Sequence, residues 1–163
     1  MTMANSPKIE EIRHRVRISY HELHQFLDGP AAHIDPARVY QAPGAEEWTL
    51  MENLAHIAEF LPYWGDQIAS LAAHPGQKFG RDQKHEGRLR AIAEHASDSM
   101  AQAKAALSEG YQHLDTVLGQ LQDSDLEVTG QHSKLGEHDV AWFIDEFIVR
   151  HLANHVLQMK NCL

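Results

Sequence analysis

The sequence lacks several features that would assign it to other classes of protein. A single cysteine, Cys162, excludes an internal disulfide framework and fits a reducing compartment. No stretch of 18 or more uninterrupted apolar residues exists, so we predict no membrane span. The first residues, Met1 to Pro7, lack the charged and apolar regions of a signal peptide. We therefore expect a cytoplasmic protein with no membrane partner.

Positive charge is also scarce. The chain has 14 Lys and Arg against 23 Asp and Glu, a formal net charge of −9 at pH 7, and no basic run. A field of this sign repels phosphate backbones, so we expect no nucleic-acid partner.

Apolar residues recur at steps of three and four in four long stretches. This spacing predicts amphipathic helices over about residues 7–28, 49–73, 85–122 and 138–162. Ser6-Pro7 is a helix start, and Thr49 with Glu52 forms a capping-box pattern.

Helix-breaking residues and the connections between the helices give further expectations. Pro62 lies inside the second helix and predicts a kink, and Gly110 is a weak point inside the third. Residues 29–48, 74–84 and 123–137 read as loops, and no β pattern is evident.

Four helices with one apolar stripe each predict an all-α protein, a four-helix bundle formed by one domain over residues 1–163. The connections of roughly 12 to 20 residues are long enough to cross the bundle, so simple up-down topology is not required.

The last helix carries the most specific pattern. His151 and His155 are four residues apart and border its apolar stripe, so both imidazoles can reach one metal ion. His56 is as far from the start of the second helix as His155 is from the end of the fourth. If these two helices are antiparallel, the three histidines lie at one height. Two ordinary histidines that reach water or a carbonyl are the alternative.

The other ten histidines carry weaker signals, being in loops, at helix ends or off the main stripes. Only His21 and His24, three residues apart on the first helix, are candidates to join a site. The chain has one Glu-x-x-His unit, Glu11 with His14, where a di-iron bundle needs two, and it has no zincin motif.

These residues resemble a known family. The segment Glu47-Trp48-Thr49 with Glu52, Leu54 and His56, the lead-in Leu135-Gly136-Glu137, and the terminal His151-x-x-x-His155 with Gln158 are similar to the DinB/YfiT-like superfamily. The resemblance implies a bundle of up-down-down-up topology, often a homodimer, and a metal site at His56, His151 and His155. The implied cofactor is a divalent transition metal, zinc or nickel first, with iron or copper as alternatives.

Two functions from different classes follow. The first is a metal-dependent enzyme with an open coordination position, a hydrolase or a low-molecular-weight-thiol S-transferase, acting on a small-molecule substrate that could be such a thiol. The alternative is a non-catalytic metal- or ligand-binding dimeric interaction module. A fourth protein ligand from His21, His24 or Glu59 would close the site and favour the module.

Three further residues lie on or near the His56 face of the helix, at helical spacing: Glu52, Glu59 and Tyr63. They are candidates to orient a ligand or to accept a proton. Surface salt bridging and packing are the alternative roles for each of them.

Overall fold

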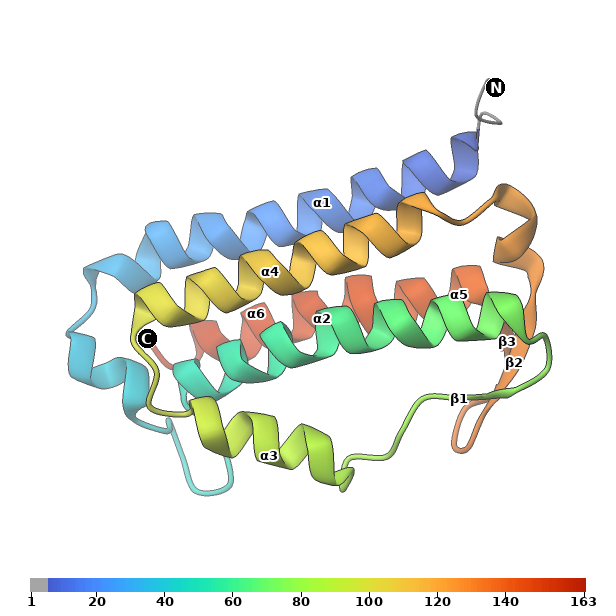
Figure 1. Cartoon of the computed structure of the whole chain (residues 1–163). Helices are drawn as coiled ribbons and strands as arrows, with labels where there is room; N and C mark the ends of the chain where they lie inside the picture. Colours follow the sequence, from blue (N-terminus) through green and yellow to red (C-terminus); the bar gives the residue numbers. More distant parts are fainter. Residues whose placement is uncertain (1–5) are drawn as a thin grey trace.

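The computed structural model describes residues 6–163, and most of them lie in helices that form an elongated bundle (Figure 1). The expectation about a signal peptide falls largely on residues 1–5, outside this range. Within residues 6–163, no helix combines the length and the apolar character needed to cross a membrane.

Four helical layers make the bundle: α1 (Pro7–Asp28), α2 (Leu50–Ala73), α4 (Met100–Gly119) and a last run made of α5 (Val140–Ile144), a π-helical segment (Asp145–Arg150) and α6 (His151–Lys160). A shorter helix, α3 (Glu86–His95), lies beside α2. The all-α bundle predicted from the sequence is confirmed.

Contacts between helices fix their relative directions. Arg13 near the start of α1 pairs with Asp115 near the end of α4, and Asp28 pairs with Lys104, so α1 and α4 are antiparallel. The start of the α5–α6 run lies against α1 near its N-terminal half, where Arg15 contacts Asp145.

The helices α2 and α4 run in the same direction (Figure 1), and their backbones approach closely at Gly110. A Cβ at Gly110 would lie 2.9 Å from the carbonyl oxygen of Ala58 and 3.1 Å from Cδ of Pro62. Gly110 is therefore a close-packing position of α4, because its missing side chain admits the backbone of α2. The helix continues through it.

The capping box predicted at the start of α2 is present. The Thr49 hydroxyl accepts from the Glu52 N–H at 3.0 Å, and the Glu52 carboxylate accepts from the Thr49 N–H at 3.1 Å. At α1, Pro7 occupies the first turn as expected, but the Ser6 side chain makes no cap. The Asp123 carboxylate accepts from the backbone N–H of Ile9 at 3.0 Å instead.

The prediction of one helix over residues 85–122 is wrong. The chain breaks between α3 and α4, because Ser99 and Gln102 form a second reciprocal capping box that starts a new helix. Asp98 accepts from the His95 ring at 2.8 Å and closes the turn that separates the two helices.

The expectation of no β structure is also wrong. Three short strands, β1 (Lys78–Phe79), β2 (Thr129–His132) and β3 (Gly136–Asp139), form a sheet in that order, with β1 and β2 parallel and β2 and β3 antiparallel. Gly130 lies against the end of α2, where a Cβ would be 2.7 Å from Leu71. The connection 29–48, expected as loop, contains two 3-10 turns, Pro30–His33 and Pro36–Tyr40.

The spacing of buried apolar residues along the whole last run explains its π-helical segment. Four buried residues of this run follow one another at steps of four: Val140, Ile144, Ile148 and Leu152. A helix of 3.6 residues per turn would rotate such a stripe steadily away from the core. A stretch with i to i+5 hydrogen bonds widens the turn and keeps these side chains inside.

Candidate metal centre

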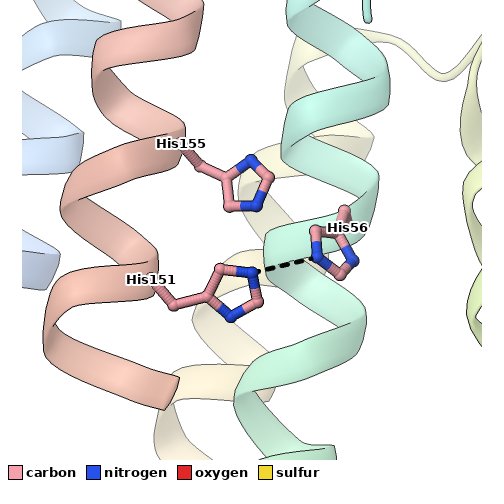
Figure 2. A group of neighbouring side chains, drawn as sticks. All are labelled: His56, His151 and His155. Carbon is pink, nitrogen blue, oxygen red and sulfur yellow. Dashed lines mark hydrogen bonds between the residues drawn. The ribbon is translucent and has the colours of Figure 1, made fainter. Parts of the chain in front are cut away.

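The three predicted histidines meet between α2 and α6. Figure 2 shows His151 and His155, one turn apart on α6, pointing toward His56 on α2. One ring nitrogen from each of the three lies within 4.8 Å of the others. The two helices are antiparallel at this point, as the height argument from the sequence required, since Asn53 contacts His155 and His56 contacts His151.

The spacing of two of the nitrogens fits a metal ion. Nε2 of His56 and Nε2 of His151 are 3.3 Å apart (Figure 2). Two nitrogens that each lie about 2.0–2.1 Å from a tetrahedral zinc are roughly 3.3–3.4 Å apart.

A hydrogen bond fixes the outer nitrogen of His155. Its Nδ1 lies 2.7 Å from Oδ1 of Asn53. The Asn53 amide is oriented in turn because its Nδ2 donates to the Thr49 carbonyl at 3.0 Å. The amide oxygen therefore faces the imidazole, which places the proton of His155 on Nδ1 and leaves the lone pair of Nε2 for a ligand.

The outer nitrogen of His151 has an acceptor, whereas that of His56 forms no hydrogen bond. Nδ1 of His151 lies 3.2 Å from the carbonyl oxygen of Phe147, which belongs to the π-helical segment. Nδ1 of His56 lies 3.4 Å from the Glu59 carboxylate, which is longer than a well-formed hydrogen bond. All three imidazoles thus turn Nε2 inward.

Burial keeps these imidazoles neutral. His56 is 1% exposed and His155 is 5% exposed. Burial, followed by the nearby His56, lowers the pKa of His151 to about 4. Burial, followed by His151 and His56, lowers the pKa of His155 to about 2. Burial also lowers the pKa of His56, against the opposing effect of Glu59. Neutral imidazole is the form that binds metals.

Aromatic rings enclose the cluster. The ring of Phe60 stacks on His151 with centroids 4.1 Å apart and planes 9° apart. Trp48 covers His155 at 5.8 Å and meets His56 edge-on at 5.2 Å. These contacts restrict the rotation of the imidazoles.

The candidate supporting residues have different positions. Glu59 contacts His56 and also holds Arg81, whose Nη2 donates to its carboxylate at 2.6 Å. The Tyr63 ring stacks against the Arg81 guanidinium, with its centroid 3.8 Å from Cζ of Arg81. Tyr63 is therefore connected to the histidines only through Arg81 and Glu59. Glu52 is used in the cap of α2.

No fourth ligand joins the three histidines among residues 6–163. The group of converging ligand atoms contains neither Glu59, His21 nor His24. His24 packs edge-on against Tyr20 on α1 instead, with centroids 4.6 Å apart. Because the group has three members, a bound ion would keep an open coordination position.

Two cavities reach the cluster from the surface. The first, of about 210 Å³, is lined by His56 and His151, and the second, of about 460 Å³, by His151 and His155. A third cavity of about 410 Å³, between α2, α3 and α4, is more apolar and includes none of the three histidines, so we place no metal centre there.

Sequence reasoning missed several residues around this centre, chiefly Asn53, Arg81 and Arg88. Asn53 gave a usable signal, because it precedes His56 by three residues and therefore shares its helix face. Arg81 lies in the polar segment before α3, where no periodic pattern places it. Arg88 lies in the first turn of α3, and the sequence does not show where that helix packs.

The fold and the site define a class: a helical bundle in which three histidines converge so that they could hold a metal ion. A family model described as the DinB superfamily matches residues 15–159. The chain therefore belongs to the DinB superfamily, as its resemblance implied. Comparison with curated proteins finds no match to it.

Proposed function

We propose that this chain is a metal-dependent enzyme that acts on a small molecule, as a hydrolase or a low-molecular-weight-thiol S-transferase. His56, His151 and His155 would hold a divalent transition ion. The observation that carries this proposal is the convergence within 4.8 Å of one ring nitrogen each from buried His56, half-buried His151 and buried His155, which line two cavities.

The donor set fits such an ion. Three imidazole nitrogens suit zinc, nickel, copper and iron, and of these zinc or nickel is our first expectation. A bound ion would act as a Lewis acid that lowers the pKa of a water or a thiol.

The residues of the chain have distinct tasks in this proposal. Asn53 and the Phe147 carbonyl hold the His155 and His151 rings with Nε2 inward. Trp48 and Phe60 limit water around the imidazoles. Glu59, held by Arg81, faces Nδ1 of His56 and keeps that ring oriented.

The test is metal content and activity measured together. Protein purified without chelators or metal-affinity tags is analysed for transition elements, for the wild type, His56→Ala and His151→Ala. We expect about one ion per chain in the wild type and a large loss in both variants. His113→Ala is the matched control, because His113 is exposed and pairs with Asp66 away from the cluster.

The activity arm uses the metal-loaded wild type and the metal-free protein. It measures transfer of a small thiol to an electrophile and hydrolysis of activated esters. Activity that needs the metal and is lost in His151→Ala supports the enzyme. Stoichiometric metal without either activity favours the alternative, a non-catalytic metal- or ligand-binding dimeric interaction module. The absence of metal after reconstitution with zinc and nickel contradicts the enzyme and leaves the interaction module without a metal.

Homodimer formation and a cytoplasmic location stay predictions. Light scattering of the purified chain measures the first, and fractionation of the source cells measures the second.

A further inference from the structure

Arg88 on α3 lies where the two cavities of the metal centre meet. Both cavities are lined by Arg88 together with Gln83, His151 and Asn154. A molecule bound in either cavity therefore shares that cavity with this guanidinium and with at least one of the three histidines.

The Arg88 guanidinium has hydrogen-bonding capacity to spare. Its Nη1 donates to the carbonyl oxygen of Gln83 at 2.8 Å, and an arginine side chain carries about five N–H donors in total. Within residues 6–163, no carboxylate lies at ion-pairing distance from it. Arg81 differs, because Glu59 neutralises it.

The acidic residues that line the cavities, which include Glu46 and Glu47 in the second one, form no ion pair with Arg88. In the first cavity, Glu146 contacts Arg150, and the Asp82 carboxylate accepts from the Lys84 N–H. Burial and the neighbouring Arg81 lower the pKa of Arg88, against a smaller opposing effect of Glu59. Arginine nevertheless stays charged in proteins. A charge that is half-buried and lacks a counter-ion favours an anionic ligand.

The Trp48 ring contacts both Arg88 and two of the histidines. The guanidinium carbon lies 5.1 Å from the centroid of the Trp48 ring, and the same ring lies 5.2 Å from the His56 ring and 5.8 Å from the His155 ring. A molecule of a few carbon atoms that lies along this indole can reach the guanidinium with one end and the imidazole cluster with the other.

We propose that Arg88 is a specificity-determining residue that binds a carboxylate of the substrate while the reactive end of that substrate lies at His56, His151 and His155. The substrate class is then a small carboxylate-bearing molecule. This inference rests on the proposed metal centre and adds the group that is recognised beside it.

The experiment compares two thiols of equal length on cobalt-loaded protein, 3-mercaptopropionate and the uncharged 3-mercaptopropionamide. Binding is followed through the visible absorption of the cobalt centre. The bound ion itself attracts the carboxylate, so the measured quantity is the ratio of the two dissociation constants in the wild type and in variants. We expect this preference to fall about tenfold or more in Arg88→Gln, since one charge-assisted hydrogen bond is lost.

Arg90→Gln is the matched control. Arg90 is on the same helix, is exposed and pairs with Glu86 at 2.8 Å, so its loss should leave the ratio unchanged. Arg88→Lys keeps the charge and should retain part of the preference, and it also tests the inference if Arg88→Gln binds no cobalt.

A ratio that is the same in the wild type and in Arg88→Gln overturns the role of Arg88 and leaves the metal centre intact. An Arg88→Lys variant that prefers the carboxylate thiol no more than Arg88→Gln does also overturns the role of Arg88. A wild-type protein that takes up no cobalt overturns the proposed metal centre and this inference with it.

Discussion

The amide oxygen of Asn53 lies 2.7 Å from Nδ1 of His155, and the amide nitrogen of Asn53 donates to the Thr49 carbonyl in the first turn of α2. The start of one helix thus sets the orientation of an imidazole on another. The Asn53 side chain is only 1% exposed, so water does not substitute for this contact.

Replacing Asn53 with Ala should weaken metal binding by about 10- to 100-fold, because His155 loses the acceptor that holds its ring with Nε2 inward. Competition with a chelating indicator measures the affinity. Gln112→Ala is the control, since this exposed amide on α4 contacts Ser108 and no histidine. Equal affinities in the wild type and Asn53→Ala would show that Asn53 does not orient the ligand.

The ion pair of Glu59 with Arg81 should stabilise the metal-free protein. The side chain of Arg81 is 5% exposed and that of Glu59 is 16% exposed. Burial raises the pKa of Glu59, but its contacts with His56 and Arg81 outweigh this effect and leave the pKa below its usual value. Glu59 is therefore a carboxylate at neutral pH.

In Glu59→Gln the Arg81 charge stays buried without a partner, and we expect a loss of about 3 kcal/mol in the free energy of unfolding. Urea unfolding of the metal-free protein measures this change. The matched control is Glu86→Gln, which breaks the exposed pair with Arg90 and should change the stability by less than about 0.5 kcal/mol. A similar small change in both variants would contradict the structural role of the buried pair.

The close approach of α2 and α4 gives a third prediction. Gly110→Ala should destabilise the protein by about 1–3 kcal/mol, because the new methyl group meets the Ala58 carbonyl, a backbone atom that cannot move alone. Gly65→Ala should be milder, since its nearest neighbour is the tip of Leu114 at 3.2 Å, which can change rotamer. Thermal unfolding of both variants measures the difference, and equal melting temperatures would refute it.

Much of this architecture could be predicted from the sequence. The bundle follows from apolar spacing, and the three histidines follow from the His151–His155 spacing and the alignment of helix ends. Asn53 was missed although its spacing from His56 places it on the same helix face. Arg88 could not be assigned to the site, since its role depends on the placement of α3.

The two errors in the fold have physical causes. Between Leu89 and Leu121 the apolar period continues across the break, while the Ser99–Gln102 capping box alone marks it. The strands β2 and β3 are four residues each and mostly polar, so their sequences show no alternation of apolar and polar residues, and the backbone pairing defines them.

Acid should destabilise the metal-free protein through the buried histidines. The pKa of His151 is about 4 and that of His155 about 2 in the folded state, against about 6.5 in an unfolded chain. Below about pH 6.5 the unfolded state therefore binds more protons than the folded state. Stability is fully present above that pH and falls as the pH decreases toward 4, by about 1.4 kcal/mol per pH unit for each such histidine.

Unfolding of metal-free protein by urea at pH 7.5, 6.5 and 5.5 measures this slope, and His155→Gln isolates one contribution. Because glutamine does not titrate, the slope below pH 6.5 should decrease by about 1.4 kcal/mol per pH unit in that variant. His113→Gln, which removes an exposed histidine away from the cluster, is the comparison variant. If His155→Gln and the wild type lose stability equally between pH 6.5 and 5.5, His155 is not held neutral by burial, and the preformed neutral cluster that the metal centre requires is absent.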